Sequence, residues 1–400
     1  MKRYTRITSL DMYTGLCSDD VVAADEFVDE GAGIYPCFYY KKDSGLYVST
    51  SVIRLIKHKG VFRHNRKFKP ARWSLRDAGG RKTFLPLGRL FGGFLQSKRT
   101  VRDWYDTCET IDTEVFKVKP FEAVTFDANT CASIPGGDFI SDSAFIEKTA
   151  YYVRKHINAI EKEFPDYTHV VLAGGKDSLL ILLADKINNE RWNVFSSEPN
   201  MPLVRQWLTD NNVAVNRLYE HDGRNEETET DLSNKIVAGD LFSNPRHMRW
   251  LPTLKKIGHA VGGKCFFWAG TMGNTLLVFS RNYHRGSIDH FYKTQFSRGA
   301  AWQGNSHQVH KNFTGFSLLS PYHSQELWEN VFFRYDHSGL CAGTDFRDKI
   351  GEALAGRTVI WPGSNPSPPL YTYAKDVDLY RHYVGYIRTA LTGTNVAYGT

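Results

Sequence analysis

The hydrophobic pattern of the chain changes near residue 140. Before that point, short apolar and aromatic runs alternate with polar turns, as in "GIYPCFYYKKDSGLYVSTSV" at residues 33–52. Two such runs joined by a Lys-Lys-Asp-Ser-Gly turn predict a β-hairpin. "SVIRLIKHKG" then has apolar residues at helical spacing and a terminal glycine, which predicts a short helix. "VFKV" and "AVTF", within residues 112–130, predict a second hairpin.

After the Gly-, Ser- and Asp-rich stretch Ile134–Ser143, helical and strand patterns alternate. The long amphipathic run "SAFIEKTAYYVRKHINAIEKEF" is followed by the strand "THVVLAG", a helix over Leu179–Asn188 and the strand "WNVFSS". The helix "PLVRQWLTDNN", the strand "VNRLYEH", the helix "HMRWLPTLKKIGHAV" and the strand "KCFFWAG" come next. This alternation predicts a parallel sheet with helices on both faces. We therefore expect an α+β N-terminal domain at 1–138 and an α/β domain at 139–400.

Composition agrees with a folded protein of this size. Of the 400 residues, 42% are hydrophobic and 14% aromatic, which favours a large core over disorder. The six cysteines form neither a CxxC pair nor a cluster at zinc spacing. Neither the apolar core of a signal peptide nor a run of about 18 apolar residues is present. These features predict a cytoplasmic protein with reduced thiols and no membrane contact.

Basic residues are concentrated in the segment from Arg54 to Arg102. It contains fifteen Lys and Arg residues and one acid, Asp77, and so carries +14 in a chain whose net charge is +7. A phosphate-rich partner such as a nucleic acid is one interpretation of this asymmetry. The other is a solvated basic face whose long side chains cover apolar surface.

The stretch with the most chemical content is "LAGGKDSLL", residues 172–180. It joins an apolar strand pattern to a helical one. Free N–H groups at a helix N-terminus bind anions, and Gly174 and Gly175 allow a phosphate to approach the backbone. Asp177 could carry Mg²⁺ between phosphate oxygens, while Lys176 and Ser178 could add a charge and a hydroxyl donor. A tight structural turn is the alternative interpretation.

The motif resembles the SGGxDS pyrophosphate loop of the N-type ATP pyrophosphatases, with Ala173 in place of the first serine. Within that group the chain is similar to the asparagine synthetase family. The similar segments are "YPCFYYKKDSGLYVSTSVIRLIKHKG", "VFKVKPFEAVTF", "SLLSPYHSQELWENVF" and "DFRDKIGEALAGRTVIW". The resemblance implies a degenerate class II amidotransferase-like (Ntn) domain followed by an α/β, HUP-like nucleotide-binding domain.

Two departures from the family limit what the resemblance implies. The family's glutaminase uses a cysteine at position 2, where this chain has Lys2, so we expect no glutamine hydrolysis, as in beta-lactam synthetases. The family motif SGExADE aligns with "AGTMGNT", where Thr271 and Asn274 replace acids. Asparagine is a poorer ligand for Mg²⁺, and threonine is no general base near neutral pH.

The resemblance implies an ATP-dependent, AMP- and pyrophosphate-forming amide ligase whose substrates are a small carboxylate and an amine. We expect Ala173, Gly174, Gly175, Lys176, Asp177, Ser178 and Gly270 to bind ATP. Asp177 and Asn274 would hold Mg²⁺, and Lys176 and Thr271 are the expected catalytic positions. Lys264, Arg357, Asp240 and His247 are further candidates for a replacement base, cation or metal ligand. A tRNA- or nucleobase-modifying pyrophosphatase and a non-catalytic nucleotide-binding remnant remain alternatives.

Overall fold

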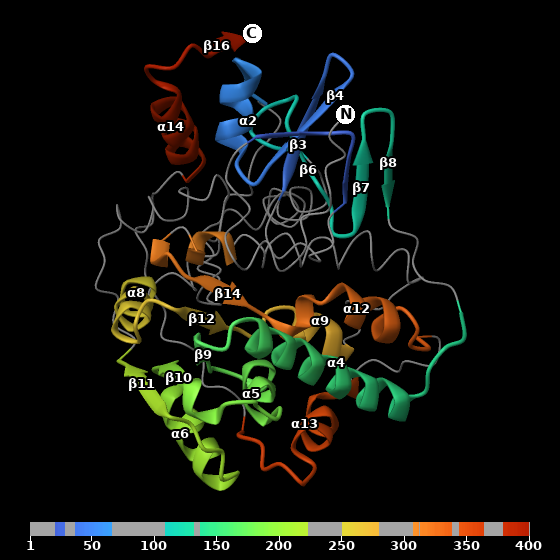
Figure 1. Ribbon diagram of the computed structural model, residues 1–400, viewed down its shortest axis with the longest axis vertical. Helices are drawn as coiled ribbons and strands as arrows, with labels where there is room; N and C mark the ends of the chain where they lie inside the picture. The colour runs from blue at the N-terminus through green and yellow to red at the C-terminus, as the bar shows by residue number, and fades with distance from the viewer. Residues whose placement is uncertain are drawn as a thin grey trace, which may run out of the picture.

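The computed structural model describes residues 21–28, 37–65, 109–131, 137–222, 250–279, 307–311, 313–337, 344–363 and 379–399. In Figure 1 these residues form a smaller β-rich part and a larger part built around a parallel sheet. The described part of the chain contains no helix that is both long and apolar enough to cross a bilayer.

A parallel five-stranded sheet is the centre of the larger part. Its strands are β9 (Thr168–Leu172), β10 (Trp192–Ser197), β11 (Arg217–His221), β12 (Cys265–Trp268) and β14 (Ser317–Leu319). They are hydrogen-bonded in the order β11-β10-β9-β12-β14, and each neighbouring pair runs parallel. This confirms the parallel sheet and the α/β class expected from the sequence.

Helices cover both faces of the sheet, as strands with apolar residues on both sides require. On one face Val171 and Trp268 belong to a core shared with α4 (Asp142–Glu163) and α5 (Lys176–Leu183). On the other face Val170 and Phe267 pack in a core that contains Leu254 and Ile257 of α8 (Leu251–Ala260). Further helices of this part of the chain are α6 (Met201–Asp210), α9 (Gly273–Leu277), α12 (Gln325–Leu327), the π-helix η7 (Trp328–Phe332) and α13 (Arg347–Ala355). Residues 307–311 are also helical, and η3 (Asn189–Arg191) and η6 (Pro321–His323) are 3-10 turns.

The strand order reverses between β9 and β12. From β9 the chain passes through β10 to the edge strand β11, whereas β12 adds to the other side of β9. In open α/β sheets ligands bind at the carboxyl ends of the strands on either side of such a reversal. Both sequence motifs of interest follow these strands, "AGGKDS" after β9 and "AGTMGNT" after β12.

The β-rich part contains the first predicted hairpin and helix. β3 (Phe38–Lys42) and β4 (Gly45–Ser49) pair antiparallel, and the two residues between them, Asp43 and Ser44, both have positive φ. Positive φ at both positions is typical of the tight type I′ hairpin turn. α2 (Val52–Lys59) begins at Ser51, whose hydroxyl accepts a hydrogen bond from the Arg54 N–H, and ends at Gly60 with φ 78°.

The second predicted hairpin is wrong. β6 (Phe116–Lys117) pairs with β3 instead of β7 (Glu122–Thr125), and β7 pairs with β2 (Glu26–Val28) and β8 (Asn129–Cys131). Phe121, between the two runs, adopts φ 58° and packs edge-on against Phe333. The chain therefore turns from one antiparallel sheet, β1-β4-β3-β6 with β1 at Val22–Ala24, to a second, β2-β7-β8.

The end of the chain returns to the β-rich part (Figure 1). α14 (Leu379–Leu391) packs on α2, and β16 (Ala397–Gly399) pairs in parallel with β5 (Val61–Arg63). Near the sheet, β13 (Val278–Phe279) pairs with β15 (Thr344–Asp345). The boundary between 138 and 139 stays a prediction, and the elements after residue 379 lie with the N-terminal elements.

Candidate functional site

A cavity of about 390 Å³ lies at the carboxyl ends of the strands, where the strand order reverses. It is bounded by the ends of β9 and β10, the segments that follow β9, β10 and β12, and one residue each from the start of α8, the helical stretch at 307–311 and β14. Its lining residues are Leu172, Ala173, Gly174, Gly175, Asp177, Ser178, Phe195, Ser197, Asn200, Trp250, Ala269, Gly270, Thr271, Asn274, His310 and Leu318. The two motifs singled out in the sequence therefore line one cavity.

The turn after β9 leads directly into the N-terminus of α5. The Ser178 hydroxyl donates to the Gly175 carbonyl at 2.9 Å and accepts the Gly174 N–H at 3.1 Å, which closes the turn on itself. Among the described residues, no group accepts a hydrogen bond from the N–H groups of Lys176 and Asp177 in the first turn. Such N–H groups make a helix N-terminus attractive to anions.

The turn after β12 packs tightly against this helix start. A Cβ atom on Gly270 would lie 2.6 Å from Asp177 Cβ and 2.6 Å from the Ser178 nitrogen, and one on Gly273 would lie 2.8 Å from Asp177 Cβ. Both glycines are therefore required by the close approach of the two turns. Met272, between them, is buried with φ 68°, a conformation that side-chain-bearing residues rarely adopt.

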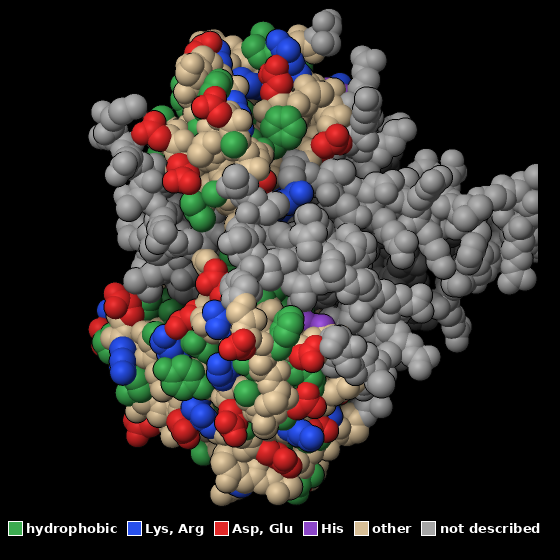
Figure 2. Space-filling model, turned by 90° about the vertical axis from the view of Figure 1, so that its right-hand side faces the viewer, with side chains coloured by type: hydrophobic (Ala, Val, Ile, Leu, Met, Phe, Trp, Pro, Cys, Tyr) green, Lys and Arg blue, Asp and Glu red, His purple; other side chains and the backbone are tan. Residues whose placement is uncertain are grey.

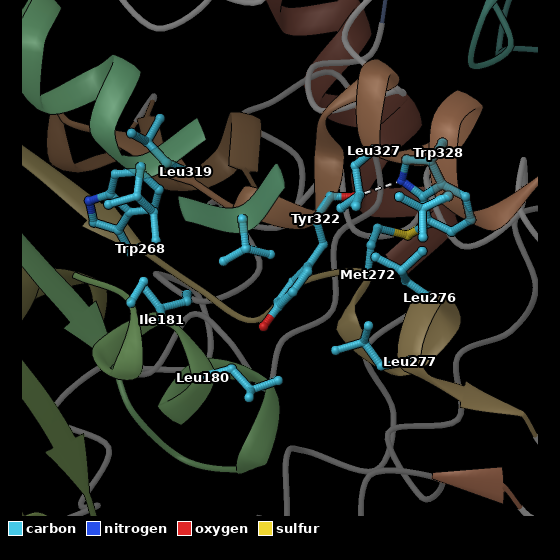
Figure 3. Close-up of a cluster of buried hydrophobic side chains, with 14 of the residues drawn as sticks. Leu180, Ile181, Trp268, Met272, Leu276, Leu277, Leu319, Tyr322, Leu327 and Trp328 are labelled. Carbon is cyan, nitrogen blue, oxygen red and sulfur yellow. Dashed lines mark hydrogen bonds between the residues drawn. The ribbon is translucent and has the colours of Figure 1, made fainter. Parts of the chain in front are cut away.

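The buried aromatic residue Tyr322 ties the loop after β14 to the same helix start. Its hydroxyl donates to the Asp177 carbonyl at 2.8 Å, and its own carbonyl accepts the Trp328 indole N–H at 2.7 Å. Figure 3 shows the Tyr322 ring reaching toward α5, with Leu180 and Ile181 beside it. The first turn of α5 is thus contacted both by the turn after β12 and by the fully buried Tyr322.

The guanidinium of Arg347, at the start of α13, connects the two residues predicted to hold a metal. Its Nη1 lies 3.3 Å from Asp177 Oδ1 and 3.1 Å from Asn274 Oδ1, while Nε and Nη2 bind both oxygens of Asp345 at 2.8 and 2.6 Å. Burial works against its charge, but the bonds to Asp345 and the nearby Asp177 raise the pKa of Arg347. Burial also raises the pKa of Asp177 to about 6, against the opposing effect of Arg347.

The expected Mg²⁺ does not fit between Asp177 Oδ1 and Asn274 Oδ1 in this arrangement. Mg²⁺ requires oxygen ligands at about 2.1 Å, and both oxygens already accept hydrogen bonds from one cationic nitrogen. The described residues also hold no group of three or more His, Cys, Asp or Glu side chains arranged for a metal. Sequence analysis did not link Arg347 to this site, since its partners Asp177 and Asn274 are 170 and 73 residues away.

Lys176, one of the two expected catalytic residues, is directed away from the cavity. Its ammonium binds Asp348 Oδ1 at 2.6 Å and lies 5.3 Å from the centre of the Trp361 ring. It is absent from the cavity lining, although its neighbours Gly175 and Asp177 are part of it. Lys176 therefore joins α5 to α13 and the segment after it.

The other expected catalytic residue, Thr271, lines the cavity and contacts a histidine. Thr271 Oγ1 is 2.8 Å from His307 Nε2, and His307 Nδ1 is 2.8 Å from the Leu318 carbonyl oxygen. Because a carbonyl only accepts, the proton of a neutral His307 ring resides on Nδ1, and Nε2 accepts the Thr271 hydroxyl proton. The lone pairs of the hydroxyl are then left for a ligand. Sequence reasoning missed His307, which is fully buried.

The cavity lining also includes two aromatic rings and two buried acceptors. The Phe195 and Trp250 rings lie 6.2 Å apart, centre to centre. His310 donates from Nδ1 to the Phe316 carbonyl, so its Nε2 is an acceptor, and burial lowers the pKa of His310 to about 3. Within the described structure, His310 Nε2 and Asn200 Oδ1 have no hydrogen-bond partner. A ligand that offers N–H donors would satisfy them.

The other candidates from the sequence lie away from the cavity or outside the described residues. Lys264 forms an exposed ion pair with Asp166 at 3.6 Å, and Arg357 donates to the Asn211 carbonyl. Asp240, His247 and most of the basic 54–102 segment lie outside the described residues. On the described part of the face in Figure 2, acidic and basic side chains are interspersed.

Comparison with known proteins does not identify a family for this chain. No family model matches the sequence, and no curated protein matches it.

Proposed function

We propose that the cavity between the β9–α5 and β12–α9 turns binds an adenine nucleotide. The observation that carries this proposal is that both motifs line one cavity at the reversal of the strand order. This is the position at which doubly wound sheets bind ligands. The phosphates would lie at the glycine turn and the first turn of α5, where two N–H groups have no acceptor among the described residues.

The nucleobase would occupy the side of the cavity lined by Phe195 and Trp250. An aromatic base can pack against these side chains. An exocyclic amine would donate to His310 Nε2, which otherwise stays buried without a partner. The distribution of groups thus suits a ligand with an anionic end and an aromatic, N–H-bearing end.

We further propose that the bound ATP is used as the resemblance to the asparagine synthetase family implies, to activate a small carboxylate as its adenylate for attack by an amine. The attacking amine must lose a proton as the amide forms. Thr271 Oγ1 could accept that proton while passing its own to His307 Nε2, because the two atoms are 2.8 Å apart. A hydroxyl held by a histidine that is itself oriented by a carbonyl is a common proton-transfer arrangement.

Product analysis tests this activity. The protein is incubated with ATP labelled in the α-phosphate and with panels of small carboxylic acids and amines, and AMP, pyrophosphate and amide are quantified. We expect AMP that depends on the acid, and amide that depends on both substrates. ATP binding without AMP in any mixture would contradict ligation while leaving nucleotide binding intact.

A nucleotide-binding protein without turnover is the second candidate. It is favoured by Lys176, whose charge is engaged by Asp348 outside the cavity, and by the Arg347 contacts of Asp177 and Asn274. In that case the same incubations would give a stable ATP complex and no pyrophosphate.

A further inference from the structure

The groups around Asp177 form a closed, charged cluster at the edge of the cavity. Arg347 is held in a fixed position by the bidentate contact with Asp345, and its side chain is only 19% exposed. Its Nη1 reaches both Asp177 and Asn274, which line the cavity. The positive charge therefore contacts one residue from each of the two turns, and it reaches the proposed phosphate position through Asp177 and Asn274, since Arg347 itself is outside the cavity lining.

We propose that Arg347 is a built-in cation that takes the place of a divalent metal at this site, so that a nucleotide binds here without Mg²⁺. The inference rests on the proposed nucleotide binding and concerns which group supplies the positive charge at that site. Arg347 acts through Asp177: it pairs with the carboxylate at the start of α5 and links it to Asn274 in the turn after β12. It is a positioning residue.

Physical chemistry favours a guanidinium in this role. An arginine cannot be deprotonated at any physiological pH, and its planar donors match carboxylate and amide oxygens at fixed angles. A free Asp177 carboxylate would repel an approaching phosphate unless a cation lay between them. With Arg347 bound, that repulsion is reduced before any ligand arrives, although the guanidinium shares its single charge between Asp177 and Asp345. Asn274 fits this arrangement, since a neutral amide oxygen accepts a guanidinium N–H without adding a second negative charge.

The test is the metal dependence of ATP binding, measured by calorimetry with the full chain in EDTA and in MgCl₂. For the unmodified protein we expect dissociation constants that agree within about threefold. The Arg347→Gln variant frees both oxygens and removes the charge, so its ATP binding should weaken at least about tenfold in EDTA and recover with Mg²⁺. General destabilisation would not produce a recovery with Mg²⁺. The exposed residue Arg388, changed to Gln, is the matched control and should behave as the unmodified protein.

The possible outcomes separate this inference from the proposed function. ATP binding by the unmodified protein that needs Mg²⁺ would overturn the role of Arg347 and leave nucleotide binding standing. No ATP binding under either condition would overturn both. If Arg347→Gln still binds in EDTA as tightly as its parent, the guanidinium is not the required cation. Should that variant not fold, the comparison of EDTA and Mg²⁺ on the unmodified protein still decides the question.

Discussion

At the scale of single residues, Asp177 is the most strongly constrained group of the site. Its carboxylate is 14% exposed and contacts Arg347, and its carbonyl accepts a hydrogen bond from the Tyr322 hydroxyl. Gly270 and Gly273 pack so closely on its Cβ that neither could carry a side chain. Removal from water disfavours its ionised form, which raises its pKa to about 6. Position 177 therefore combines tight packing with an energetically costly charge.

The ionisation of Asp177 should affect the pH dependence of the free energy of unfolding. Because the pKa of Asp177 is raised in the folded state, its contribution to stability is fully present below the unfolded pKa near 4 and is lost as pH rises through about 6. Asp177→Asn removes this loss. The free energy of unfolding of the variant, relative to the parent, should therefore rise by up to about 3 kcal/mol between pH 4 and pH 7. Urea denaturation at both pH values measures it, with the exposed Asp138→Asn as control. Parallel pH profiles for Asp177→Asn and its parent would show that the carboxylate is not desolvated.

The Thr271–His307 contact gives a second prediction at this scale. Thr271→Val keeps the shape of the side chain but removes the hydroxyl that would transfer the amine proton. The single-turnover rate of amide formation should fall about 100-fold, whereas ATP affinity stays near that of the parent. Thr271→Ser keeps the hydroxyl and should retain most of the rate. An unchanged rate in Thr271→Val would exclude the proposed proton path.

At the scale of elements, the site depends on two turns that pack against each other without space for a side chain. Gly270→Ala would place a Cβ 2.6 Å from the Ser178 backbone nitrogen, and backbone cannot move aside as a flexible side chain can. We expect a loss of about 1–3 kcal/mol in the free energy of unfolding, or more, together with weakened ATP binding. The control is Gly363→Ala, where a Cβ would meet no atom within 4 Å. Equal stability of the two variants in denaturant titrations would contradict the close packing of the turns.

The local hydrophobic pattern predicted secondary-structure elements well where every residue of an element is buried. "WNVFSS" matches β10 residue for residue, and every residue of this strand is buried. The helix expected at Leu179–Asn188 is instead α5, Lys176–Leu183: it starts at the glycine turn, and Ala184 has extended backbone angles. The pairing of β6 with β3 could not be predicted, because a two-residue strand carries no signal for its partner.

Only those parts of the site that are formed by contiguous sequence motifs could be predicted. The glycine turn and "AGTMGNT" could be recognised, and their adjacency follows from the ends of parallel strands. Arg347 and His307 could not be predicted, because ion pairs and hydrogen bonds between distant segments leave no periodic pattern. The only local signal was "DFRDK", a group of alternating charges before the apolar pattern of α13.

At the scale of the whole molecule, the last helix and strand stabilise the first part of the chain. Ile387 and Leu391 of α14 are buried in one core with Leu55 and Ile56 of α2. The same core includes Leu251 and Val309, and Gln308 donates to the Thr50 carbonyl at 2.9 Å. The N-terminal elements therefore depend on α14, which follows the parallel sheet, and on residues that lie between its strands in the sequence.

A cavity created in this shared core should destabilise α2 more than it destabilises the parallel sheet. Ile387→Ala is expected to cost about 2–5 kcal/mol, and the amide hydrogens of α2 should exchange faster while those of β9 and β10 remain protected. The exposed Arg388→Ala serves as the control. Unchanged exchange in α2 would mean that α14 does not support it.

The central claim is that the cavity at the reversal of the strand order binds the phosphates of a nucleotide. Calorimetric titration with ATP tests it most directly. A Cβ on Gly174 meets only Asn200 Nδ2, at 3.5 Å, so longer side chains can enter the cavity there without a backbone clash. Gly174→Gln and Gly174→Glu fill the same space, and only glutamate brings a negative charge to the proposed phosphate position. We predict saturable binding to the unmodified protein, and affinity at least about tenfold weaker for Gly174→Glu than for Gly174→Gln. Equal affinities for the two variants, or no binding by the unmodified protein, would contradict the account.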